Sequence, residues 1–342
     1  MAAQDRSTYE VFEIKSYDGT KTVDLSGGIV NFSYFENVLS PMVTAQALIV
    51  NTGNVVRDDD GDVSSVYNGL PLNGGEKVSI KIPATGEGPG IEFTEQNDNE
   101  LYVASITNVL IDAERESFTL NLVSREAITN ETSRIGKKFP STEPISDSVK
   151  EIIKNYLLSD KDVDIDETQN PYGFIGNMKK PFTTLTWLAT KSVPGNVSGG
   201  SATAGYFFFE TYLGYHFRSV DSLISQDPFP VEYTYSPGIV DTQDPMKDFK
   251  ILDFSTMRNQ KLIENLEKGA YCTYRMYYNP LNSTFTTPQQ GEFKVSQYSK
   301  NMENLGRDFE ILLPPVNKTK KSLGNVPSRY MTGVLDFGTL ER

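Results

Sequence analysis

The 342-residue chain has very few of the side chains on which most catalytic and metal sites depend. It contains one cysteine, Cys272, and one histidine, His216. A disulfide framework within one chain is therefore excluded, and one Cys with one His cannot assemble a four-ligand zinc site. The sequence also lacks a G-x-S-x-G nucleophile motif, a phosphate-binding P-loop and a G-x-G-x-x-G motif. We expect no cofactor and no metal centre, and any imidazole-based catalysis would have to use His216.

Long apolar runs are absent as well. No stretch approaches the roughly 18 consecutive apolar residues of a membrane-spanning helix, so we expect no stable membrane insertion. The first residues show no apolar segment behind a basic end, so no secretory signal is predicted. Hydrophobic residues make up 38% of the chain and charged residues 23%. These values are ordinary for a globular protein, and the length suggests two or three domains.

Positive charge is scarce in the first part of the chain. The net charge is −13, and residues 1–135 hold 21 Asp and Glu against 9 Lys and Arg, whereas the remainder is nearly balanced. An acidic domain does not suit binding to nucleic acid through phosphate neutralisation. The excess indicates either a solvated acidic surface or a surface that must not adhere to nucleic acid.

The densest acidic run, "RDDDGD" (57–62), invites comparison with a calcium-binding loop. Counted from Asp58, the glycine that an EF-hand requires at position 6 stands at position 4, as Gly61, and position 12 is Gly69 instead of glutamate. The match fails. We interpret the run Asp58–Asp62 as a solvated loop and leave open whether it binds a cation.

Residues 1–135 carry patterns typical of strands. Short segments rich in β-branched and aromatic residues are separated by clusters of Gly, Asn, Pro and Asp, as in an antiparallel barrel or sandwich. In the first expected strand we place Tyr9, Val11 and Phe12 near the core. The expected strands cover 8–15, 28–38, 42–53, 76–83, 101–112 and 117–124.

The pattern changes near residue 135. The segment 144–160 predicts an amphipathic helix with Ser146 or Asp147 as its N-terminal cap, and 181–193 predicts a second helix. A Gly/Ser-rich loop, an aromatic hairpin and a short helix follow. After residue 230 strands return at 231–236, 249–255, 270–279 and 291–299, with a helix over 258–269.

The aromatic hairpin, "GYFFFETYLGYHFRSVDSLIS" (205–225), contains the only histidine. In one interpretation His216 is a general base oriented by Glu210 or Asp221. In the other it is a strand residue of a structural hairpin, with Tyr215 and Phe217 on the opposite face. The missing nucleophile motif favours the second. Paired carboxylates for glycoside hydrolysis stay open, because 45 acidic residues always offer pairs and nothing singles out two.

Several of these segments resemble one protein family. The helix "PFTTLTWLATKSV", with Phe182, Leu185 and Leu188 at helical spacing, leads into the "GYFFFE" strand and "GYHFRSVDSLI". This order resembles the α/β domain of central baseplate hub proteins of contractile-tailed phages and the hub part of type VI secretion valine-glycine-repeat spike proteins. The stretch "NLEKGAYCTYRMYYNPLNSTF" resembles the family's second barrel. A turn before an alternating strand resembles the phage hubs most, and consists of Leu70, Pro71, Gly74, Gly75 and Glu76.

The resemblance implies a fold that is mainly β with an α/β insert. The expected domains are a first tail-tube-like antiparallel β-barrel (1–135), a small α/β insert domain (136–229) and a second tube-like barrel with a C-terminal tail (230–342). It also implies a structural virion protein without enzymatic activity. The protein would be a homotrimeric hub that adapts the six-fold tail tube to the three-fold needle and lets DNA pass.

The implied partners are the spike or needle protein, the tail tube or tube-initiator protein, and the tape measure protein. The implied location is the tail baseplate of the virion, after synthesis in the host cytoplasm. We expect part of the acidic excess to face the channel, from strand carboxylates and not from Asp58–Asp60. The alternative function is a β-rich tail glycan-binding protein or tail-associated hydrolase. The expected partner-binding residues are spaced apolar side chains near the end of the chain: Tyr330, Val334, Leu335, Phe337 and Leu340.

Overall fold

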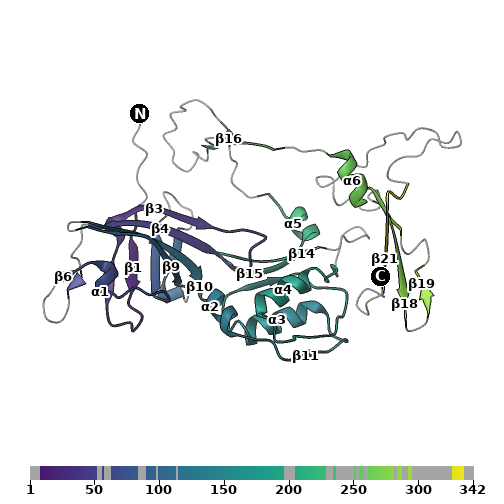
Figure 1. Ribbon diagram of the computed structural model, residues 1–342, viewed down its shortest axis with the longest axis horizontal. Coiled ribbons are helices and arrows are strands. Elements are labelled where there is room, and N and C mark those ends of the chain that lie inside the picture. The colour runs from purple at the N-terminus through teal and green to yellow at the C-terminus, as the bar shows by residue number, and fades with distance from the viewer. Residues whose placement is uncertain are drawn as a thin grey trace.

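A computed structural model shows a chain built mainly from strands, with helices gathered in its middle part (Figure 1). In the described ranges, no helix has the length and apolar character needed to cross a membrane. The structure describes residues 8–51, 56–57, 63–83, 90–97, 99–112, 115–195, 205–228, 234–235, 250–251, 254–257, 261–280, 283–286, 292–294 and 326–334.

One antiparallel sheet of eight strands forms the first part of the chain. The strand order is β2-β1-β7-β9-β10-β4-β3, with β8 beside β7. Its strands are β1 (Val11–Lys15), β2 (Thr22–Asp24), β3 (Ile29–Phe35), β4 (Thr44–Asn51), β7 (Lys77–Ile82), β8 (Ile91–Phe93), β9 (Leu101–Ile111) and β10 (Glu116–Ser124). Short elements between them are η1 (Ser26–Gly28), β5 (Val56–Arg57), β6 (Val63–Ser64), α1 (Val66–Gly69) and η2 (Glu95–Asn97).

The sheet curls into a half-barrel around an apolar core. Phe12 on β1 and Phe32 on β3 come from strands far apart in the sheet order, yet their rings lie 6.0 Å apart across the core. Phe12 and Ile14 are fully buried, whereas Val11 is half-buried. The prediction that Val11 faces the core was therefore wrong by one position, because residue 11 lies on the outer side of the pleat.

The middle part is an α/β unit that continues directly from β10. Its helices are α2 (Arg125–Thr132), α3 (Ile145–Asn155), α4 (Pro181–Ala189) and α5 (Val220–Ser225). Its strands are β11 (Lys138–Phe139), β12 (Val163–Ile165), β13 (Phe174–Ile175), β14 (Tyr206–Thr211) and β15 (Gly214–Ser219). Helices α3 and α4 lie side by side, and α4 packs against β14 (Figure 1).

The apolar stripes predicted for the two helices are confirmed. Val149 and Ile152 on α3 and Leu185 and Leu188 on α4 are fully buried in a shared core. The predicted cap of α3 was wrong. The helix begins after Pro144 without a side-chain cap, and the backbone N–H of Ser146 instead donates to Thr168 Oγ1 at 3.0 Å.

The last part contributes short strands and one helix to the described chain. These elements are β16 (Thr234–Tyr235), β17 (Lys250–Ile251), α6 (Leu262–Lys268), β18 (Cys272–Asn279), β19 (Thr284–Phe285), β20 (Glu292–Lys294) and β21 (Arg329–Val334). Helix α6 ends at Gly269, whose φ of 72° is the left-handed conformation expected of a C-terminal stop. Strand β18 pairs antiparallel with β19 and β20 and parallel with β21. The described part of this region is a small mixed sheet, and the second barrel stays a prediction.

Candidate functional site

The lone histidine lies on an aromatic hairpin formed by β14 and β15. Its ring stacks on Phe209 with centroids 4.9 Å apart, and His216 Nε2 lies 2.8 Å from Thr211 Oγ1. Nδ1 lies 3.5 Å from a carboxylate oxygen of Asp164 on β12. Glu210, one of the two expected orienting carboxylates, pairs with the residue before His216 and points to the opposite face of the hairpin. The geometry is that of a packed strand residue, as the structural interpretation predicted.

Glu210 instead joins the hairpin to the first sheet. Its Oε2 accepts hydrogen bonds from the backbone N–H of Val43, at 2.9 Å, and from Ser124 Oγ, at 2.7 Å. Val43 precedes β4 and Ser124 ends β10, so one carboxylate ties two strands of the sheet to the α/β unit. The Glu210 side chain is 1% exposed.

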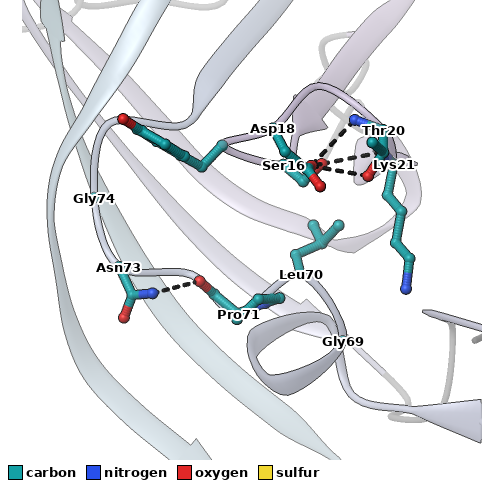
Figure 2. Close-up of a pocket in the computed structure, with 10 residues that line it drawn as sticks. Ser16, Asp18, Thr20, Lys21, Gly69, Leu70, Pro71, Asn73 and Gly74 are labelled. Carbon is teal, nitrogen blue, oxygen red and sulfur yellow. Dashed lines mark hydrogen bonds between the residues drawn. The ribbon is translucent and has the colours of Figure 1, made fainter.

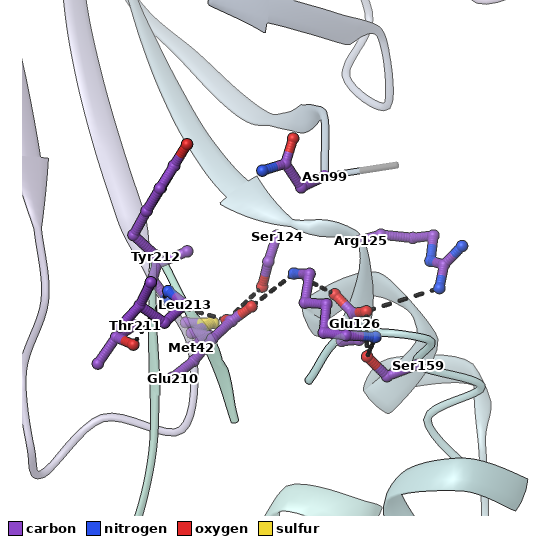
Figure 3. A network of polar contacts seen from close by, with 12 residues as sticks. Met42, Asn99, Ser124, Arg125, Glu126, Ser159, Glu210, Thr211, Tyr212 and Leu213 are labelled. Atoms are coloured by element: carbon purple, nitrogen blue, oxygen red, sulfur yellow. Dashed lines mark hydrogen bonds and ion pairs between the residues drawn. The ribbon is translucent and has the colours of Figure 1, made fainter. Parts of the chain in front are cut away.

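Lys161 links this carboxylate to a second one, Glu126. Figure 3 shows Glu210 and Glu126 with Ser124 and Ser159, which donate to them. Lys161 Nζ lies 2.6 Å from Glu210 Oε1 and 2.8 Å from Glu126 Oε2. Glu126, on α2, is fully buried and also accepts a hydrogen bond from Ser159 Oγ at 2.7 Å. We call Glu210, Lys161 and Glu126 the buried triad. It contains two carboxylates and one ammonium, and it lies where the first sheet meets the α/β unit.

The charges of the buried triad shift one another's pKa values. Burial raises the pKa of Glu210 above its usual value, against the attraction of Lys161. Burial also acts on Glu126, but the nearby Lys161 ammonium and the hydrogen bonds hold the pKa of that carboxyl below its usual value. Burial would lower the pKa of Lys161, and the two carboxylates outweigh it and raise that pKa. Glu210 is thus the member whose charge is least favoured by its surroundings.

A polar cavity of about 220 Å³ opens beside the buried triad. Asp160, Asp162, Asn97, Asn99 and Tyr212 contribute to its wall. Among the described residues, no group of three or more His, Cys, Asp or Glu side chains is placed to hold a metal ion. The arrangement fits a structural joint, because Glu210 accepts hydrogen bonds from both strands of the sheet that it reaches and is paired with Lys161 on the other side.

The Gly-Gly-Glu turn that carried much of the resemblance adopts a conformation that explains its residues. Gly74 and Gly75 have φ values of 101° and 93°, which side chains with a Cβ rarely adopt. Glu76 is 1% exposed, and its carboxylate accepts backbone hydrogen bonds from Asn73, at 2.7 Å, and from Gly74. The glycines thus permit the backbone conformation of the turn, and the buried Glu76 carboxylate stabilises it through hydrogen bonds to the turn's own backbone.

A pocket of about 550 Å³ lies between this turn and the loop that joins β1 to β2 (Figure 2). Tyr17, Leu70 and Pro71 supply apolar wall. In the facing loop, hydrogen bonds from Ser16 and from Thr20 lower the pKa of Asp18 to about 2. The Asp18 carboxylate is therefore engaged by hydrogen bonds within its own loop.

The sheet carries its charges on one side of its strand order. Lys77 Nζ lies 2.9 Å from Glu100, which also attracts Lys15 at 3.5 Å. Lys81 lies 3.3 Å from Glu10. All three lysines come from β1 and β7, and each of them is paired with a carboxylate.

The two expected partner-binding residues that the structure describes lie on one face of β21. Tyr330 is 71% exposed and Val334 is 68% exposed. They stand beside Tyr274 and Tyr278 of β18 in the parallel register. Three further expected residues, Leu335, Phe337 and Leu340, lie outside the described residues, and so does the acidic run Asp58–Asp62.

Sequence patterns did not reveal the buried triad. Glu210 was considered only as a partner of His216, and Lys161 and Glu126 carried no motif. The only available signal was a lysine between Asp160 and Asp162, which is equally typical of a solvated loop.

No protein-family model matches the chain, and no curated protein matches it. Solved structures do. The tail protein of Neisseria meningitidis MC58 is 11% identical, with a TM-score of 0.47, over 95% of this chain and 71% of that one. The 43 kDa tail protein of prophage MuSo2 from Shewanella oneidensis is 12% identical, with a TM-score of 0.39, over 61% of this chain. The match spans 54% of the Shewanella protein's length.

A third similar structure is the E. coli c3393 protein, described as a type VI secretion component with structural similarity to T4 tail proteins gp27 and gp5. It is 8% identical, with a TM-score of 0.31, over 63% of this chain and 47% of that one. The solved structures to which this chain is similar thus include tail proteins and a type VI secretion component.

Proposed function

We propose that the protein is a structural component of a phage-type tail and forms the central hub of its baseplate. Three copies form a ring that adapts the six-fold tail tube to a three-fold needle and leaves a channel through which DNA passes. The needle protein binds on one side, and the tube or tube-initiator protein, with the tape measure protein, on the other.

The observation that carries this proposal is the way two motifs fold. The turn at Gly74–Gly75–Glu76 lies at the entry to β7 of a curled half-barrel, where the resemblance implied a tube-like barrel. The aromatic hairpin packs within an α/β unit and carries no catalytic arrangement around His216. The buried triad supports the proposal too, since its member Glu210 joins the α/β unit to the sheet through hydrogen bonds from Val43 and Ser124.

The division of the chain follows the same proposal. Residues 1–135 form the first tube-like barrel, 136–229 the insert, and 230–342 the second tube-like barrel with its tail. Two such barrels in each of three copies supply six similar contacts to a six-fold tube, which is why a trimer can adapt the two symmetries.

The mass of the protein in solution tests this function. We expect an assembly of three times the 38.2 kDa of the single chain, and ring-shaped particles in electron micrographs. Addition of a needle protein and a tube protein from the same tail should give a complex with the two at opposite ends of the ring. Turnover of peptidoglycan or tight binding of oligosaccharides by the purified chain would contradict the proposal and favour the glycan-directed alternative.

A further inference from the structure

Two short basic segments, far apart in the sequence, meet at the margin of the α/β unit, where β11 lies (Figure 1). Residues 134–138 contain three Lys and Arg, residues 174–180 contain two, and neither segment contains Asp or Glu. Strands β11 and β13 pair antiparallel, and a bridge joins Ile135 to Lys179. This pairing brings five cations together in a chain whose net charge is −13.

The two paired strands turn one face to the core and the other to solvent. Phe139 and Phe174 stack in the core, with ring centroids 4.4 Å apart. The neighbouring register pair, Lys138 and Ile175, lies on the opposite face, because side chains alternate along a strand. Both are exposed, Ile175 to 57%. The fold thus leaves a large apolar side chain in water beside a cation.

The turn after β13 displays a second apolar side chain next to the first. Asn177 and Met178 have φ values of 49° and 55°, in the left-handed region, which costs a residue such as methionine about 1–3 kcal/mol. Met178 is 64% exposed, so burial within the chain does not offset that strain. Its Sγ lies 3.2 Å from the position of a Cβ added at Gly136, so the side chain rests on bare backbone. Strain of this kind is common where a side chain is presented to a ligand.

The charge of this surface is only partly neutralised. Lys137 and Lys180 form ion pairs with carboxylates of α3 and α2. Within the described ranges, no carboxylate forms an ion pair with Lys138 or Lys179. Lys179 Nζ lies instead over the ring of Trp187, 5.6 Å from its centroid.

We call Lys138, Ile175, Met178 and Lys179 the basic apolar patch. We infer that this patch binds an acidic segment of a second protein. The apolar side chains of that segment cover Ile175 and Met178, and its carboxylates pair with Lys138 and Lys179. Opposite charge steers such a segment to the patch, and the two apolar groups anchor it there. The inference goes beyond the proposed function and does not depend on the ring of three copies.

Other occupants fit the basic apolar patch less well. A duplex gains little, because few unneutralised cations face its phosphates and the net charge of −13 opposes its approach. Anionic membranes are bound through clusters of about 4–8 Lys or Arg, and here two of the five cations are already paired. A second copy would bring its own charge of −13 against the first.

Trp187 allows binding to be detected at the patch itself, because it is the only tryptophan in the chain and lies beneath Lys179. The probe is a labelled peptide of repeated Glu-Glu-Leu, which contains no tryptophan. Its binding should change the fluorescence emission of Trp187, and its anisotropy gives the dissociation constant. A peptide of repeated Glu-Glu-Ser keeps the charge without the apolar side chains and should bind about threefold or more weakly.

Reversal of charge in the patch tests the role of its lysines. Lys138→Glu with Lys179→Glu should raise the dissociation constant of the Glu-Glu-Leu peptide about tenfold or more. Lys261→Glu with Lys268→Glu is the matched control, since it changes the net charge equally at two exposed lysines of α6. Met178→Ser should raise the same constant about threefold, because it removes an apolar anchor.

Circular dichroism and thermal melting must show that each variant is folded, and Lys138→Gln with Lys179→Gln replaces the reversed pair if that chain does not fold. Unchanged Trp187 emission, or equal binding by the patch variant and the α6 control, would overturn the inference. Equal binding of the Glu-Glu-Ser peptide would overturn the apolar anchoring. Tighter binding of phosphatidylglycerol vesicles or duplex DNA than of the peptide would assign the patch to a membrane or to nucleic acid. A lower assembly mass of the patch variant would assign it to a contact between copies. The mass of the unchanged chain tests the proposed ring separately, so either idea can fail alone.

Discussion

Lys161 is the cation on which the two carboxylates of the buried triad depend. Its ammonium contacts two buried carboxylates, and its removal would leave Glu210 and Glu126 facing each other without a cation. We expect Lys161→Met to lower the free energy of unfolding by about 3–5 kcal/mol, as breaking a buried ion pair does. Urea denaturation of the purified chain measures this directly.

Glu210→Gln is the matched comparison at the same contact. It leaves one carboxylate with one ammonium, and the carboxylate that it removes is the one whose charge is disfavoured by burial. We expect Glu210→Gln to lower the free energy of unfolding by less than half as much as Lys161→Met does. Equal losses in the two variants would show that the net charge of the buried triad does not matter.

The raised pKa of Glu210 also predicts a pH dependence. A carboxyl with a raised pKa binds its proton more tightly in the folded chain, so its stabilising contribution is full below the usual glutamate pKa and declines as pH rises through the raised value. Glu126 has a lowered pKa, so its contribution to the stability of the folded chain has the opposite pH dependence and is lost as pH falls. The free energy of unfolding of Glu210→Gln should therefore gain on that of the unchanged chain as pH rises above the usual glutamate pKa. A difference that is constant with pH would contradict this assignment.

Among the elements, the turn before β7 offers the clearest test of a backbone requirement. Gly75 has a φ of 93°, and no atom lies closer than 3.9 Å to a Cβ added there. Gly75→Ala would therefore be destabilised by the strained backbone conformation and not by steric crowding. We expect a loss of about 1–3 kcal/mol in unfolding free energy. Gly27→Ala is the control, since Gly27 has an ordinary φ and open space around it.

The longer strands of the first sheet and the two amphipathic helices could be predicted because their apolar residues repeat at a fixed spacing. The two- and three-residue strands β2, β8, β11, β12 and β13 are too short to show such a repeat and were not predicted. Helix α2 could not be predicted, because the residues that it buries are Glu126 and Asn130. Their partners come from distant segments: Lys161 for the first, and for the second the backbone N–H of Phe182, which donates to Asn130 Oδ1 at 2.8 Å. A helix with a polar inward face has no hydrophobic period. The buried triad escaped prediction for the same reason, since it exists only once three segments meet.

Strand β21 carries two of the five predicted partner-binding residues, Tyr330 and Val334. Truncation before it would remove a strand from the β18 sheet, so side-chain changes are the better test. Tyr330→Ser combined with Val334→Ser keeps the backbone pairing and removes two exposed apolar groups. We expect an unchanged melting temperature and weaker capture of the needle protein in a pull-down. If the double variant and the unchanged chain captured the needle protein equally well, the contact would have to lie elsewhere in the protein.

For the whole molecule, the distribution of charge predicts how the assembly treats DNA. Strands β9, β10, β4 and β3 of the first sheet contain no Lys or Arg, and the lysines of β1 and β7 are paired with carboxylates. We expect no retardation of duplex DNA by the assembled protein even at about 50 mM salt, where phosphate contacts are strong. A shift that disappears at higher salt would reveal a basic surface and would exclude a channel that DNA passes freely.

The direct continuation of β10 into α2 has a mechanical consequence. A pull on the α/β unit along the chain is transmitted to β10, which is paired on both sides, with β4 and with β9. The pull acts along these strands, so it loads the hydrogen bonds of both ladders in shear, and many bonds must yield together. A force applied across the strands would break the same hydrogen bonds one at a time. The protein should therefore withstand far more force along the axis of β10 than across it, and single-molecule stretching from two such directions would reveal the difference.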